Sequence, residues 1–117
     1  MLFVHYPKCS TCRNAKKWLD EHGIAYESRD IREENPKAEE LKIWHEKSGL
    51  PLKRLFNTSG MVYKSLNLKD RLAEMGEEEQ YELLASDGML VKRPILVGDT
   101  FALIGFRPKE WQEVLLS

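Results

Sequence analysis

One stretch near the N-terminus decides the fold: Leu2-Phe3-Val4-His5-Tyr6-Pro7-Lys8-Cys9-Ser10-Thr11-Cys12. Residues 2–6 are short and largely apolar and are followed by Pro7, a pattern typical of a buried strand that ends in a loop. After Cys12, apolar side chains recur at helical spacing, and Gly23 is placed to end that helix. A pair of cysteines therefore falls between a strand and the start of a helix.

Beyond this helix, residues 24–28 alternate between two faces and predict a second strand. A strand, a helix and a strand within about 30 residues form a βαβ unit, so we expect the two strands to be parallel. The next helix is predicted to begin with Asn35 as its cap and Pro36 in its first position. Residues 52–86 predict a cluster of short helices.

The end of the chain predicts a β-hairpin, with strands 94–97 and 100–104 around a Gly98-Asp99 turn, and then a last helix. The predicted order is β-α-β, a helical insert at about 35–88, then β-β-α, in one domain spanning 1–117. This is the order of a thioredoxin-like α/β fold with a central mixed sheet. In that fold a Cys-x-x-Cys begins the first helix and a cis proline precedes the third strand, the place of Pro94.

The charge balance excludes several classes of protein. The chain has 117 residues, with 18 Lys and Arg against 19 Asp and Glu, and a formal net charge of -1. This balance argues against direct binding to nucleic acid or to anionic membranes. No apolar run approaches the roughly 20 residues of a membrane span, and the N-terminus does not resemble a signal peptide. We therefore expect a cytoplasmic protein.

The cysteine pair indicates chemistry rather than a structural scaffold. Cys9 and Cys12 are the two cysteines of the chain, and they enclose too short a loop to stabilise much of a fold. Backbone N–H groups at the helix start should lower the pKa of Cys9, whereas Cys12 lies one turn further in and should be less acidic. Cys9 is thus the predicted nucleophile and Cys12 the resolving thiol of a redox-active disulfide.

Two alternatives to this interpretation are a pair of inert thiols and a zinc site. Zinc takes four ligands, and the sequence has no second Cys-x-x-Cys and no ligand spacing among His5, His22 and His45. We therefore expect no metal and no other cofactor.

Three arginines are candidates for binding an anion near Cys9. Arg93 precedes the predicted cis proline and could stabilise a thiolate or an oxyanion; its alternative is a solvated cation beside Lys92. Arg107 could approach the same loop from the last helix, or pair with Glu110 at the surface. Arg13, in the first helical turn, should be exposed and add to the positive field.

Three segments carry a family resemblance: Tyr6-Pro7-Lys8-Cys9-Ser10-Thr11-Cys12-Arg13-Asn14-Ala15, Lys92-Arg93-Pro94-Ile95 and Gly105-Phe106-Arg107-Pro108. They resemble the arsenate reductase-like (ArsC) family, which also contains the Spx/MgsR-type bacterial regulators. The resemblance implies that a cysteine matching Cys9 attacks arsenate among three arginines. Two of these match Arg93 and Arg107, while Asn57 lies at or near the third. It also implies an oxyanion site that includes Ser10, Thr11, Arg13 and Pro94.

Two functions follow from this resemblance. The first is a thiol oxidoreductase that uses Cys9 and Cys12 and is reduced by a glutaredoxin/glutathione or thioredoxin system. The second is a regulator that binds RNA polymerase and uses the same cysteines as a redox switch. In arsenate reductases of this type a serine commonly matches Cys12, so the second cysteine resembles the regulators. Their partner surface involves a glycine in the insert, for which Gly49 and Gly60 are the candidates.

Overall fold

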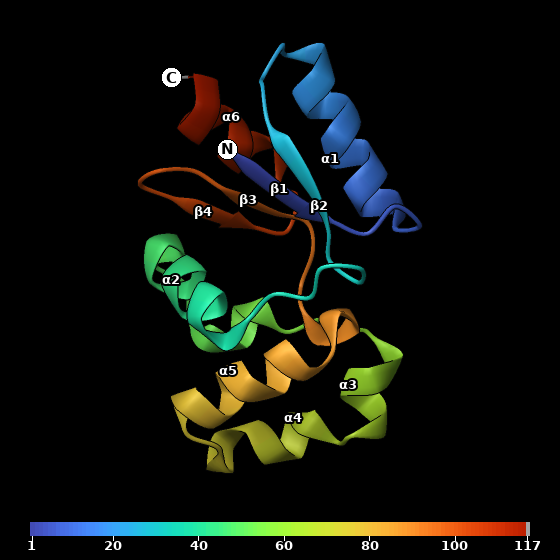
Figure 1. Cartoon of the computed structure of the whole chain (residues 1–117), viewed down its shortest axis with the longest axis vertical. Coiled ribbons are helices and arrows are strands. Elements are labelled where there is room, and N and C mark those ends of the chain that lie inside the picture. Colours follow the sequence, from blue (N-terminus) through green and yellow to red (C-terminus); the bar gives the residue numbers. More distant parts are fainter. Residues whose placement is uncertain (117) are drawn as a thin grey trace.

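A computed structural model describes residues 1–116 of the chain. A four-stranded sheet in the order β2-β1-β3-β4 lies at its centre (Figure 1). The strands are β1 (Leu2–His5), β2 (Glu27–Asp30), β3 (Ile95–Val97) and β4 (Ala102–Ile104). β1 and β2 are parallel, whereas β3 is antiparallel to both β1 and β4. The predicted mixed sheet of a thioredoxin-like fold is confirmed.

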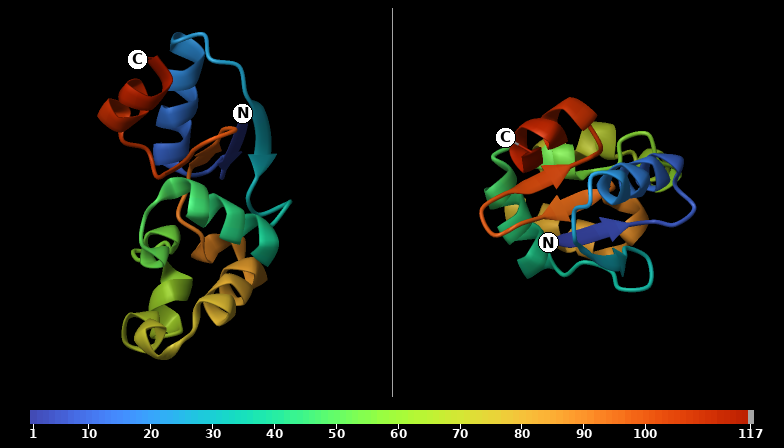
Figure 2. Two further views of the ribbon diagram at one scale, coloured as in Figure 1. Left: turned by 90° about the vertical axis from the view of Figure 1, so that its left-hand side faces the viewer. Right: turned by 90° about the horizontal axis from the view of Figure 1, so that it is seen from above.

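Helices cover both faces of the sheet because apolar side chains on its central strands point alternately to either side. Phe3 belongs to a core cluster with residues of α1 (Ser10–Glu21) and α6 (Pro108–Leu116). Val4 belongs to a second, larger cluster with residues of α2 (Ala38–Ser48) and of the helical insert. Figure 2 shows α1 and α6 together at one end of the molecule and the insert at the other.

The helical insert packs its short helices against the end of α2 and against one another. After α2 it contains 3₁₀ helices η1 (Leu52–Leu55), η2 (Leu72–Glu74) and η3 (Gly88–Leu90), and α-helices α3 (Met61–Ser65), α4 (Leu68–Arg71) and α5 (Glu77–Ser86). Buried side chains from all these elements join the same core cluster as Val4. The insert is therefore continuous with one face of the sheet.

Strand β2 begins three residues later than predicted. The backbone N–H of Ile24 donates to the carbonyl of Leu19 at 3.0 Å, so Ile24 still belongs to the closing turn of α1. Pairing with β1 starts only where the N–H of Glu27 donates to Met1.

The predicted cap of α2 was also wrong, because Lys37 rather than Asn35 precedes its first helical residue. The side-chain amide of Asn35 donates instead to the carbonyl of Ala85, 2.8 Å away, and so links this loop to the end of α5. The N–H of Lys37 donates to the carboxylate of Glu40, which closes the first turn of α2.

The hairpin turn lies one residue beyond its predicted position. The N–H of Gly98 donates to the carbonyl of Phe101 at 2.9 Å, which places Asp99 and Thr100 at the tip. β4 therefore begins at Ala102 and pairs with Val97.

Candidate active site

Cys9 is the N-cap residue of α1, at the point where the chain leaves β1 and enters the helix. Its N–H donates to the carbonyl of Tyr6 at 2.9 Å, and its own carbonyl accepts the first helical bond, from Arg13. The Cys9 side chain is half-buried and makes no capping hydrogen bond, but the backbone N–H groups of Thr11 and Cys12 help to lower the pKa of its thiol. The helix start therefore surrounds this sulfur with backbone donors.

The two thiols differ in acidity. Burial alone would raise the pKa of Cys9, but the N–H and thiol of Cys12, the charge of Arg93 and the N–H of Thr11 together lower it below its ordinary value. The Cys12 side chain is fully buried, and burial raises its pKa to about 12 despite a hydrogen bond from the N–H of Tyr6. Both cysteines are free thiols, and Cys9 is the more acidic of the two.

Arg93 and Pro94 lie on the segment that leads into β3, and the peptide bond between them is cis, as the sequence predicts. The guanidinium carbon of Arg93 lies 5.4 Å from the centre of the Tyr6 ring. Its Nη1 donates to the carbonyl of Val91 at 3.4 Å, while its Nε is buried without a hydrogen-bond partner. A buried donor without a partner is costly, and the positive charge of this side chain acts on the thiol of Cys9.

The other predicted anion-binding residues have exposed side chains. Ser10, Thr11 and Arg13 are exposed in the first turn of α1. Arg13 Nη1 donates to the carbonyl of Pro7, so the Arg13 side chain contacts the loop before α1. Arg107 is exposed just before α6, and within residues 1–116 its side chain makes no hydrogen bond or ion pair, either with Glu110 or near Cys9.

Tyr6 contributes more to this site than the sequence indicated. Its N–H donates to Cys12 Sγ at 3.5 Å, its carbonyl accepts from Cys9, and its ring packs beside the Arg93 guanidinium. The available signal was its position, since the residue between the end of β1 and Pro7 must lie next to the start of α1.

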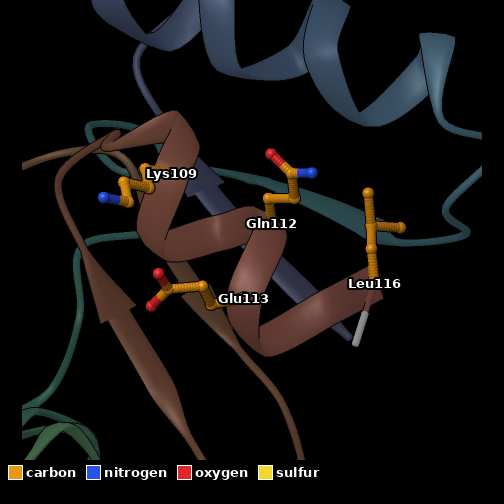
Figure 3. A pocket seen from close by; sticks show the side chains of 4 residues that line it. All are labelled: Lys109, Gln112, Glu113 and Leu116. Atoms are coloured by element: carbon orange, nitrogen blue, oxygen red, sulfur yellow. The ribbon is translucent and has the colours of Figure 1, made fainter.

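The surface of α6 carries a hollow of about 340 Å³ that is separate from the cysteine pair. Figure 3 shows the side chains that line it projecting from α6: Lys109, Gln112, Glu113 and Leu116. None of the site residues described above lines it, so it offers no binding pocket for the chemistry of Cys9.

Within residues 1–116, no group of three or more His, Cys, Asp or Glu side chains is arranged to hold a metal ion. No helix in the same range is long and apolar enough to cross a membrane.

The strand order, the half-buried cysteine at the start of α1 and the cis proline before β3 define a thioredoxin-like fold with a Cys-x-x-Cys at the start of its first helix. Within this class the chain belongs to the ArsC family, whose sequence model matches residues 4–114.

Its relatives include a regulatory protein and a possible arsenate reductase. The chain is 54% identical to the uncharacterised protein YusI of Bacillus subtilis, over 97% of this chain and 96% of that one. It is 36% identical to the regulatory protein MgsR of the same organism, over 94% of this chain and 86% of the relative. A possible arsenate reductase from Streptococcus mutans has a solved structure with a TM-score of 0.84 and 50% identity, covering 91% of this chain and 90% of that one.

Proposed function

We propose that the protein is a thiol oxidoreductase in which Cys9 is the nucleophile and Cys12 the resolving thiol. The observation that carries this proposal is the contrast between the two sulfurs. Cys9 is half-buried with a lowered pKa at a helix start, and Cys12 is fully buried with a raised pKa. A nucleophile must be ionised and reachable, whereas a resolving thiol has to react only after the first bond has formed.

The reaction is a pair of thiol–disulfide exchanges. The Cys9 thiolate attacks one sulfur of a substrate disulfide, whose S–S bond breaks and releases one thiolate that takes a proton from solvent. A mixed disulfide between Cys9 and the remaining half results. The Cys12 thiolate then attacks Cys9 Sγ, expels the second substrate thiolate and forms the Cys9–Cys12 disulfide. The substrate has gained two electrons and the protein has lost two, which a dithiol reductant of the thioredoxin or glutaredoxin class restores.

The order of these steps follows from the electrostatics of the pair. The Cys9 thiolate contributes to the raised pKa of Cys12 by its charge and by accepting a hydrogen bond from it. Forming the mixed disulfide removes that charge. The pKa of Cys12 then falls, so the second thiol is activated by completion of the first step.

Arg93 supports this site as a fixed positive charge. It lowers the pKa of Cys9, and its charge attracts a negatively charged group on the substrate. An oxyanion such as arsenate is one such group, and carboxylate-bearing disulfides are another.

Alkylation with iodoacetamide across pH tests the proposed roles. Cys9 should react with an apparent pKa below the ordinary value of about 8.5, while Cys12 should stay unmodified near pH 7. Arg93→Ala should raise the apparent pKa of Cys9, because it removes a nearby positive charge. The matched control is Arg13→Ala, an exposed arginine of the same turn. Faster modification of Cys12 than of Cys9 at pH 7 would reverse the assignment.

A second candidate function is that of a redox-switched regulator that binds RNA polymerase. Two observations favour it: the identity to MgsR and the presence of a second cysteine, Cys12. Of the two glycines considered for a partner surface, Gly49 ends α2 in an open position, whereas a side chain on Gly60 would meet Asn57 Nδ2 at 2.7 Å. We therefore assign the candidate contact to Gly49.

Affinity purification from cells, followed by identification of the bound proteins, separates the two candidates. If the protein is an oxidoreductase, it should be recovered without RNA polymerase. If traces of polymerase are recovered, Gly49→Arg should not change their amount. Stoichiometric polymerase that is lost in Gly49→Arg and retained in the exposed control Gly76→Arg would instead favour the regulator.

A further inference from the structure

A basic cleft of about 320 Å³ opens between the helical insert and the segment that leads into β3. Its volume lies within the range of small-molecule binding sites. Figure 1 shows this junction, where the chain passes from the insert to β3. Neither cysteine lines the cleft, so it is a feature separate from the candidate active site. We use the name basic cleft for the space lined by six residues: Pro51, Lys53, Arg54, Phe56, Thr58 and Lys92.

The lining of the basic cleft carries three positive charges and no carboxylate. Within residues 1–116, none of Lys53, Arg54 and Lys92 has an ion-pair partner. Four other cations of the chain each pair with an acidic residue: Lys16, Lys17, Arg29 and Lys42. Because cations gathered without counter-charges repel one another, a bound anion would stabilise this cluster.

The backbone around the basic cleft is held in place before any ligand binds. The N–H of Lys92 donates to the carbonyl of Leu55 at 2.7 Å, and Phe56 forms an antiparallel bridge with Val91. The Lys92 side chain lies beside the backbone of Gly105, since a Cβ on Gly105 would be 3.3 Å from Lys92 Cε. These contacts fix the origins of the cationic side chains, which reduces the entropic cost of binding.

The donors of the basic cleft match a phosphate group better than a carboxylate. A phosphate monoester carries about −1.5 to −2 charges at pH 7 and has three acceptor oxygens, whereas an ionised carboxylate has two oxygens that share one charge. Arg54 can donate two parallel hydrogen bonds to two phosphate oxygens. Lys53 and Lys92 add charge, and Thr58 adds a hydroxyl donor.

The charge distribution of the chain argues against nucleic acid as the ligand. Nucleic acids are bound along extended basic surfaces, but this chain has 19 Asp and Glu against 18 Lys and Arg, and the three unpaired cations share one hollow. Pro51 and the methylene stems of the lysines provide apolar contacts for a small organic group. The cleft therefore fits a small molecule with one phosphate group.

We propose that the basic cleft is a binding site for the phosphate group of a small phosphate monoester. Arg54 is the main ligand of the phosphate, and Lys53, Lys92 and Thr58 complete the site. This site lies outside the proposed oxidoreductase function and does not depend on it.

Titration of ¹⁵N-labelled protein with glycerol 3-phosphate tests the inference. Amide shifts should concentrate at residues 53–58 and 92. Arg54→Gln should raise the Kd by about 10-fold, as expected for a charge-assisted hydrogen bond, and Lys53→Gln by about 2- to 5-fold, as expected for an exposed charge pair. The matched control is Lys16→Gln/Lys17→Gln, which removes two exposed lysine charges from α1 and should leave the Kd unchanged.

Two further ligands define the chemistry of the site. Succinate, a dicarboxylate, should bind at least fivefold more weakly than glycerol 3-phosphate, and inorganic phosphate at least twofold more weakly, since it lacks the organic group. Equal binding of succinate would overturn the preference for phosphate, and equal binding of inorganic phosphate would overturn the assignment to an ester.

The position of the shifts separates this site from the cysteine pair. Shifts confined to residues 9–13, or a Kd that neither cleft substitution changes, would overturn the inference. Glycerol 3-phosphate contains no sulfur and exchanges nothing with Cys9. The titration therefore gives the same answer whether or not the protein reduces disulfides.

Discussion

Cys9→Ser is expected to abolish disulfide reduction, with a loss of at least about 10³-fold in turnover. The physical reason is that a serine hydroxyl stays protonated at neutral pH, even beside the groups that lower the pKa of Cys9.

Cys12→Ser should behave differently. It leaves the first exchange intact and removes the thiol that releases the mixed disulfide, so the protein should accumulate with half of the substrate attached to Cys9.

The measurement is NADPH oxidation coupled through thioredoxin reductase and thioredoxin, with bis(2-hydroxyethyl) disulfide as substrate, together with the intact mass of each variant. Ser28→Ala is the control, since Ser28 is an exposed serine on β2 with no assigned role. It should retain turnover within a few-fold of the parent. Full turnover by Cys9→Ser, or no adduct in Cys12→Ser, would refute the proposed roles.

Much of the fold could be predicted because its main features depend on local sequence. Pro7 and Gly23 delimit β1 and α1, and the Cys-x-x-Cys between them identifies the helix start. The cis bond before Pro94 and the parallel pairing of β1 with β2 follow from the same order of elements. These features require no knowledge of distant contacts.

The errors arose where a distant partner decides the local structure. Asn35 has the residue type of a helix cap, but its side chain bonds Ala85, 50 residues away. The burial of Arg93 Nε without a partner depends on the packing of the insert against the segment before β3, which no sequence spacing specifies.

Arsenate reduction by the parent protein is expected to be slow, because the charge that the family resemblance places in the insert is replaced by Asn57. The Asn57 backbone N–H donates to Leu90, and its side-chain oxygen accepts from Ser59, so this residue holds a turn and supplies no cation. The nearest cation in sequence, Arg54, lies in η1, three residues earlier. A hydrogen bond to a charged group contributes about 1.5–3 kcal/mol, which corresponds to a roughly 10- to 100-fold change in rate.

Asn57→Arg should therefore raise arsenate turnover by about 10- to 100-fold, and Asn57→Gln, which adds length without charge, should not. Arg93→Ala should lower whatever turnover exists by a similar factor, since the positive charge of Arg93 acts on Cys9. Arg107→Ala should have a smaller effect because Arg107 is exposed and makes no contact near Cys9 within residues 1–116. The assay couples arsenate to the glutathione/glutaredoxin or thioredoxin system. Robust turnover by the parent that Arg93→Ala leaves unchanged would place the oxyanion site elsewhere.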